Sequence, residues 1–147
     1  MSTVTIEVHD EHPAAASALV DDGIGQSNDA AAPLQEVKPL SCFAIAKSGT
    51  VIGGALGRRW GNCCELQQLW VEPGHRRQGI AKRLVAAFEA QANSHGCGRF
   101  YLETFSFQAP GFYRSLGYTV AHENKFFPLG IIKYLMVKQI AQGQSAA

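Results

Sequence analysis

The segment of residues 66–84, LQQLWVEPGHRRQGIAKRL, constrains this chain most. An apolar strand leads into a Pro-Gly turn, two arginines follow, and an amphipathic helix then begins. The first turn of a helix leaves backbone N–H groups unpaired, and the macrodipole adds roughly half a positive charge there. Gly79 lacks the Cβ that would hold an anion away from the backbone, and Arg76 and Arg77 supply charge-assisted contacts. The segment therefore predicts phosphate binding at a helix N-terminus.

The spacing of this loop separates it from other phosphate-binding loops. It lacks the Gly-Lys-Ser/Thr ending of a Walker A loop and the GxGxxG of dinucleotide folds. Residues 76–81, RRQGIA, fit the pattern Q/R-x-x-G-x-G/A and resemble the GNAT superfamily of acyl-CoA-dependent N-acyltransferases. The resemblance implies acetyl-CoA as cosubstrate, with its pyrophosphate on this loop. The implied binding residues are Leu69, Trp70, Val71, Arg76, Arg77, Gln78, Gly79, Ile80, Ala81 and Lys82. The alternative is a solvated basic turn that caps an ordinary helix.

A second motif, FYRSLGY at residues 112–118, is similar to the family's Y-x-x-x-G-F/Y turn. In many members the tyrosine lies beside the thioester sulfur and donates a proton to the departing thiolate. The resemblance therefore implies Tyr113 as general acid. The alternative is that Phe112, Tyr113 and Leu116 form the apolar face of a short helix.

Amine acetylation also needs a base, because an aliphatic ammonium with a pKa near ~10.4 is only about one part in 10³ neutral at pH 7. Glu65 is the preferred base, since some family members keep a glutamate at this place on the strand. Strand alternation puts Glu65, Gln67 and Leu69 on one face unless a bulge intervenes. Glu103 on the next strand is the second candidate, and Glu72 is assigned to the turn.

The resemblance also implies a mechanism. Two neighbouring parallel strands separate, and the pantetheine arm pairs with the backbone of Leu69 and Val71. A backbone N–H near Trp70 or Val71 polarises the thioester carbonyl, and the amine attacks it directly. Cys63 and Cys64 lie at the wrong end of the strand to carry the acyl group.

The order of elements predicts a mixed α/β sheet of about seven strands with a central parallel pair and helices on both faces. The expected strands cover residues 3–8, 42–47, 51–58, 62–71, 99–105, 118–124 and 131–138. A helix stripe (Ile80, Ala81, Leu84, Val85, Phe88, Ala92) joins two of them as a right-handed crossover, and a short helix covers residues 109–116. Residues 11–34 are rich in alanine and interrupted by Gly23, Gly25 and Pro33, which favours one or two short helices with a flexible break.

The bulk properties fit one domain of 147 residues, with residues 1–40 on the acceptor side, 41–138 as the best-matched core and 139–147 as a frayed tail. No stretch approaches ~20 apolar residues and the N-terminus is acidic, so we expect no membrane span or signal peptide and a cytoplasmic location. The cysteines and histidines show no metal-binding spacing, so we expect no metal.

Charge is unevenly distributed along the chain. Residues 1–57 carry seven acidic residues against two lysines, whereas residues 58–147 carry eleven Lys and Arg against five acids. A basic C-terminal part suits a polyanionic cofactor, and an acidic N-terminal part favours a cationic acceptor. The net charge of only +1 and the lack of an aromatic-basic motif argue against nucleic-acid binding.

The favoured function is therefore an N-acetyltransferase for a primary amine of a small cationic molecule. A protein or peptide N-acetyltransferase and a non-catalytic acyl-CoA-binding module are the alternatives. A homodimer could use the apolar residues Trp60, Phe126, Phe127, Leu129, Ile131 and Ile132, although core packing would explain them equally well.

Overall fold

The structure, a computed structural model, describes residues 3–141. The chain divides between Glu36 and Val37 into two compact units. The first contains helix α1 (Ala14–Ala30) and the short 3-10 helix η1 (Ala32–Glu36). The second contains six strands and the other helices. They are β1 (Lys38–Ile45), β2 (Val51–Trp60), β3 (Cys63–Val71), η2 (Pro73–His75), α2 (Ile80–Ser94), β4 (Arg99–Phe105), α3 (Pro110–Ser115), β5 (Thr119–Asn124), η3 (Pro128–Gly130) and β6 (Lys133–Gln139).

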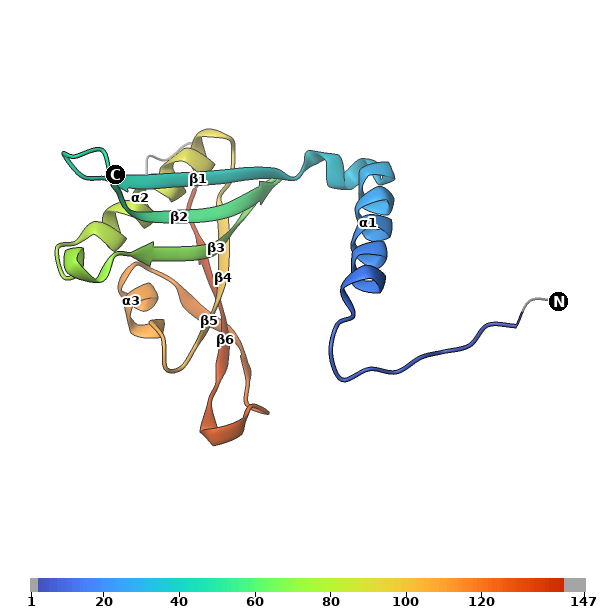
Figure 1. Cartoon of the computed structure of the whole chain (residues 1–147). Helices are drawn as coiled ribbons and strands as arrows, with labels where there is room; N and C mark the ends of the chain where they lie inside the picture. The colour runs from blue at the N-terminus through green and yellow to red at the C-terminus, as the bar shows by residue number, and fades with distance from the viewer. Residues whose placement is uncertain (1–2, 142–147) are drawn as a thin grey trace. The chain divides into compact units, whose positions relative to one another are not determined.

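The strands form one mixed sheet in the order β1-β2-β3-β4-β6-β5 (Figure 1). β1, β2 and β3 are antiparallel neighbours joined by tight turns, as their sequence predicts. β3 and β4 are parallel, because α2 carries the chain back between them. The expected mixed sheet with a central parallel pair is thus confirmed, with six strands instead of about seven.

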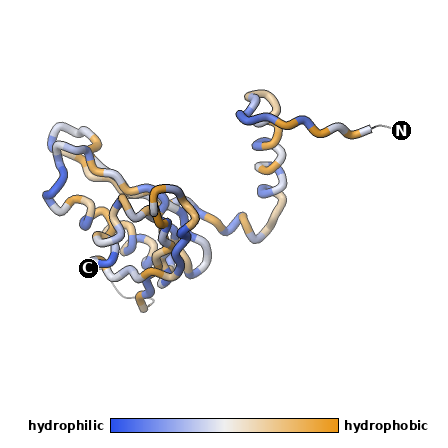
Figure 2. The backbone as a smooth tube through the Cα atoms, turned by 90° about the horizontal axis from the view of Figure 1, so that it is seen from below, coloured by the Kyte–Doolittle hydropathy of each residue, from blue (hydrophilic) through white to orange (hydrophobic). Residues whose placement is uncertain are grey.

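The predicted first strand, residues 3–8, is wrong. The segment alternates hydrophobic and hydrophilic residues (Figure 2), but it has no strand structure, and Val4, Ile6 and Val8 are each more than 80% exposed. Alternation alone does not make a strand, because an extended segment is stable only when another strand completes its hydrogen bonds. The predicted break inside residues 11–34 does not fall at the two glycines but at Ala31, where α1 ends just before η1 and Pro33. α1 continues through Gly23 and Gly25, although glycine has a low helix propensity.

The core of the second unit lies between the sheet and α2 (Figure 1). Leu84, Val85, Phe88 and Ala92 are buried, which confirms most of the predicted stripe. Gly57 on β2 allows this close approach, because a Cβ there would lie 2.8 Å from the Phe88 ring.

The two ends of α2 are set by glycines. α2 begins after Gly79 and is followed by Gly96, both with left-handed φ angles. Gly96 has the predicted role of C-terminal helix stop. The tail expected over residues 139–147 lies largely outside the described residues.

Candidate active site

The parallel ladder between β3 and β4 is short. Its three rungs pair Cys63 with Arg99, Cys64 with Phe100 and Glu65 with Tyr101. Beyond Glu65, β3 remains paired to β2 on its other side, while β4 remains paired to β6 up to Phe105. The two strands therefore separate after Glu65. In the described part of the chain, β3 and β4 do not pair with each other beyond this point, so the backbone N–H and C=O groups on their facing edges are not joined by a ladder.

A bulge marks the same point on β3. Gly57 pairs with Leu66 and Leu56 pairs with Gln68, so Gln67 is an extra residue opposite β2. The bulge is the exception that the sequence analysis allowed for, so Glu65, Gln67 and Leu69 do not share one face. Leu66 and Leu69 lie on the core side, whereas Glu65 and Gln68 share the opposite face with their partners Arg58 and Leu56.

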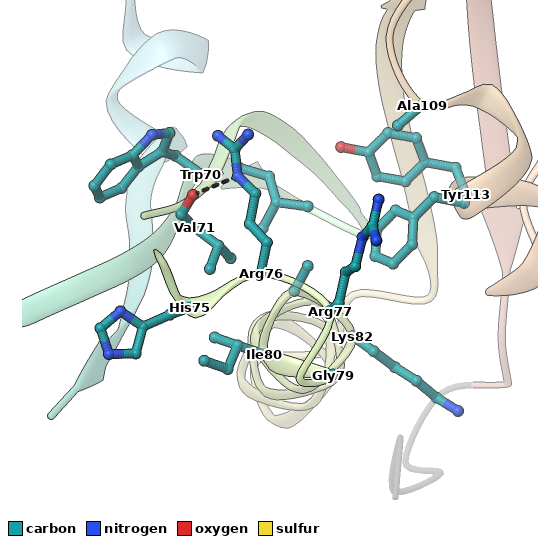
Figure 3. A pocket seen from close by; sticks show the side chains of 13 residues that line it. Trp70, Val71, His75, Arg76, Arg77, Gly79, Ile80, Lys82, Ala109 and Tyr113 are labelled. Carbon is teal, nitrogen blue, oxygen red and sulfur yellow. Dashed lines mark hydrogen bonds between the residues drawn. The ribbon is translucent and has the colours of Figure 1, made fainter. Parts of the chain in front are cut away.

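A cavity of about 450 Å³ opens between the end of β3, the start of α2 and helix α3 (Figure 3). It is lined by Leu69, Trp70, Val71, His75, Arg76, Arg77, Gly79, Ile80, Ala81, Lys82, Ala109, Phe112 and Tyr113. The structure thus brings together all of the predicted cofactor-binding residues except Gln78, and adds Tyr113. The cofactor-binding prediction did not include His75, Ala109 and Phe112; His75 lies beside Arg76 in the same loop, whereas Ala109 and Phe112 reach the cavity only through the fold.

The loop before α2 has the backbone conformation of an anion-binding turn. Arg77 and Gly79 both adopt left-handed φ angles, of 64° and 76°. The N–H of Arg76 bonds to Pro73 and that of Arg83 to Gly79. Within residues 3–141, no turn or loop carbonyl accepts a hydrogen bond from the backbone N–H groups between these two residues. A Cβ at Gly79 would meet no atom within 4 Å, so the backbone there is open to a ligand.

Three cationic side chains line the cavity, and one of them is fixed by a hydrogen bond to the backbone. Arg76 donates from Nε to the Val71 carbonyl at 2.9 Å, and this bond fixes its guanidinium at the end of β3 (Figure 3). Arg77 and Lys82 also line the cavity. Three cations and the α2 N-terminus therefore surround a space of suitable chemistry for a diphosphate. His75 pairs with Glu72 at 2.8 Å, which places Glu72 in the turn, as expected.

Tyr113 extends from α3 into the cavity, and Figure 3 shows its hydroxyl directed toward the end of β3. Its ring packs edge-on against Phe112 and Tyr118, with centroid distances of 5.2 and 5.9 Å. Burial raises the pKa of Tyr113 above its ordinary value, so the phenol keeps its proton at neutral pH.

The two candidate bases lie outside the cavity lining. Glu65 occupies the last rung of the parallel ladder and accepts a hydrogen bond of 3.0 Å from Nε of Arg58. Burial, and then the Glu65 carboxylate, raise the pKa of the neighbouring Tyr101. Glu103 pairs with Lys133 at 3.1 Å on the far side of β4 from β3. Of the two carboxylates, Glu65 is the one where the strands begin to separate.

The described residues contain neither a metal-binding cluster nor a membrane-spanning helix. Among residues 3–141, no three His, Cys, Asp or Glu side chains are grouped to hold a metal ion. No helix in the same range combines the length and apolar character of a membrane span.

Comparison with known proteins places the fold and site in a family. The sequence model of the Acetyltransferase (GNAT) family matches residues 8–118. The chain is 37% identical over 112 residues to Blasticidin-S acetyltransferase of Streptomyces morookaense, covering 74% of this chain and 82% of that protein. The chain belongs to the GNAT family and is an acetyl-CoA-dependent acetyltransferase.

Solved structures agree on the fold. A crystal structure of an acetyltransferase from Bacillus cereus superposes with a TM-score of 0.70 at 23% identity, covering 91% of this chain and 98% of that one. A Bacillus anthracis structure in complex with acetyl coenzyme A gives a TM-score of 0.62 at 18% identity, over 70% of this chain and 63% of that one.

Proposed function

We propose that this protein transfers the acetyl group of acetyl-CoA to a primary amine of a small, cationic molecule. The observation that carries the proposal is the cavity that joins the separated edge of β3, the start of α2 and Tyr113. The 37% identical relative is named for a small antibiotic, and the acidic residues of the N-terminal part favour a cationic acceptor. Blasticidin S is therefore the first acceptor to test.

In the proposed reaction, backbone N–H groups at Ile80 and Ala81 and the side chains of Arg77 and Lys82 bind the diphosphate of acetyl-CoA. The backbone of Leu69 and Val71 lies along the pantetheine arm and orients the thioester. Trp70 and Val71 N–H groups are the candidate donors to the carbonyl oxygen. Gln78 acts only through its backbone, since its side chain is outside the cavity lining.

Proton transfer completes the scheme. Glu65 accepts a proton from the acceptor's ammonium, directly or through water, and the neutral amine attacks the thioester carbon. The tetrahedral intermediate collapses with cleavage of the C–S bond, Tyr113 donates its proton to the leaving sulfur, and the second proton of the attacking nitrogen passes to the Tyr113 phenolate, directly or through water. The phenol is a weaker acid than the thiol that it generates, so its contribution is an assisting one.

The test is thiol release from acetyl-CoA with a panel of acceptors: blasticidin S, a polyamine and a peptide with a free N-terminus. We expect blasticidin S or the polyamine to release CoA thiol and the Tyr113→Phe variant to be about 10²–10⁴ times slower. Wild-type turnover in Tyr113→Phe would remove the acid role. Turnover of the peptide alone would replace the small-molecule assignment, and CoA binding without turnover of any amine would indicate a binding module.

The proposal also includes a cellular location and a domain organisation. The described cysteines Cys42, Cys63, Cys64 and Cys97 are all free thiols, which supports a reducing, cytoplasmic setting. Residues 1–147 are proposed to work as one acetyltransferase domain.

We further propose a homodimer through the β5 edge of the sheet. Phe126 and Leu129, next to this edge strand, are 77% and 94% exposed, and an edge strand can pair with its copy across a two-fold axis. Sedimentation should give a dimer for the wild type and a monomer for Phe126→Ser. A monomeric wild type would refute the dimer.

A further inference from the structure

A buried polar cluster lies directly behind Tyr113 and has no part in the scheme above. The Tyr118 hydroxyl donates a hydrogen bond of 2.8 Å to Oε2 of Glu89, and Nζ of Lys138 donates one of 2.7 Å to Oε1 of the same carboxylate. Tyr118 and Glu89 are each only 2% exposed. The Lys138 ammonium also lies 5.7 Å from the centroid of the Tyr118 ring. Both oxygens of this buried carboxylate are thus satisfied.

The cluster connects three separate elements. Glu89 belongs to α2, the helix whose N-terminus borders the cavity, whereas Lys138 belongs to β6 and Tyr118 lies just before β5. Burial, and then the Glu89 carboxylate, raise the pKa of the Tyr118 phenol, so the hydroxyl remains a donor. Displacement of Glu89, Tyr118 or Lys138 would break one of these hydrogen bonds and leave a buried polar group unpaired, which is costly. The cluster therefore favours a single arrangement of the three side chains.

Tyr118 is joined to Tyr113 in two ways. The two rings pack edge-on, with centroids 5.9 Å apart and planes at 71°. The backbone N–H of Tyr118 also bonds to the Tyr113 carbonyl at 3.0 Å, across the turn at Gly117. The Tyr113 ring therefore packs directly against Tyr118, and Tyr118 is in turn held by Glu89.

We infer that Tyr118, anchored by Glu89 and Lys138, is a positioning residue that holds the Tyr113 hydroxyl in register with the cofactor-binding start of α2. The inference rests on the proposed function, because Tyr113 is its point of action. Tyr118 is not among the residues that line the cavity and acts through Tyr113. Loss of its hydroxyl releases the ring without removing it, so kcat decreases while both KM values are maintained.

The matched control is Tyr134. Like Tyr118, Tyr134 packs against the core, although it is only partly buried. Within residues 3–141 its hydroxyl has no hydrogen-bond partner, and its ring contacts Arg114. Tyr134→Phe therefore removes the same hydroxyl group without breaking a hydrogen bond. We expect Tyr118→Phe to lower kcat about tenfold and Tyr134→Phe to leave it unchanged. A Tyr118→Phe variant with wild-type kcat but a lower melting temperature would show a purely structural role and overturn the inference.

A double-mutant cycle gives the sharper test. If Tyr118 acts through Tyr113, its substitution should have no further effect on kcat in the Tyr113→Phe background, whereas independent effects would multiply. Multiplied effects overturn the inference. A second readout needs no turnover: with ¹³C-labelled tyrosine, the Tyr113 ring signal should shift or broaden in Tyr118→Phe and not in Tyr134→Phe. An unchanged signal refutes the positioning role, whereas failure of every amine in the thiol assay bears on the proposed function alone.

Discussion

Replacement of Gly79 by alanine tests the cofactor site most directly, because Gly96 at the other end of α2 supplies a matched control. Both glycines have left-handed backbones, with φ of 76° and 92°, and an added Cβ at either would meet no atom within 4 Å. Alanine in this conformation costs about 1–2 kcal/mol at each site. The two variants should therefore lose similar stability, and only Gly79→Ala places a methyl group in the cavity at the start of α2.

The expected effect on binding follows from the contacts at the start of α2. A methyl group at Gly79 would block one charge-assisted hydrogen bond from the backbone to a phosphate oxygen, which contributes about 1.5–3 kcal/mol. That loss corresponds to about 10- to 150-fold weaker binding of CoA. Calorimetric titration with CoA measures it in both variants, and thermal unfolding checks that their stabilities match.

The control decides the interpretation. Equal CoA affinity in Gly79→Ala and Gly96→Ala would show that the backbone at Gly79 does not approach the cofactor. In that case the loop before α2 would be an ordinary basic turn, and the proposed function would lose its main support.

Two further predictions concern the base and a buried thiol. Glu65→Gln should lower the acceptor kcat/KM by about 10²–10³ at neutral pH with an unchanged KM for acetyl-CoA, and the loss should shrink as the pH approaches the amine's own pKa, near ~10. A pH-independent loss would argue against a base. Burial, and then the neighbouring Cys97 and Cys63, raise the pKa of Cys64 to about 12 from an ordinary value of 9.0. The stability contributed by the neutral thiol is therefore complete below pH 9 and should fall by up to about 1.4 kcal/mol per pH unit as the pH rises toward 12. Urea unfolding between pH 8 and 11 measures this loss, which should be smaller in Cys64→Ala; an equal loss in that variant would contradict it.

The sequence was most informative where local chemistry leaves few alternatives. Gly79 has a positive φ angle, which glycine adopts readily, and it directly precedes the first residue of α2. The position of this loop at the start of a helix could therefore be predicted from residues 76–81. The strand at residues 99–105 is predicted to the residue, because the segment RFYLETF is rich in aromatic residues and lies between a glycine and a polar turn.

Features that depend on the pairing of one strand with another could not be predicted from the sequence. The segment at residues 3–8 has strand-like alternation but remains exposed and irregular, and the bulge at Gln67 leaves no mark in composition. A bulge is set by the register between two strands, which is a property of the pair and not of either sequence alone. The face on which Glu65 lies could therefore be decided only by the fold.

The amino-acid sequence by itself determined the family and the two candidate site motifs, the proposed cofactor loop and the proposed acid, because each is a run of neighbouring residues. Only the tertiary structure decided where β3 and β4 separate, that His75 and Phe112 complete the cavity, and that Glu89 lies behind Tyr118. These relations join residues far apart in the sequence, such as Leu69 and Phe112, which are 43 positions apart. Bringing such residues together costs chain entropy, which only the packing of the whole core offsets.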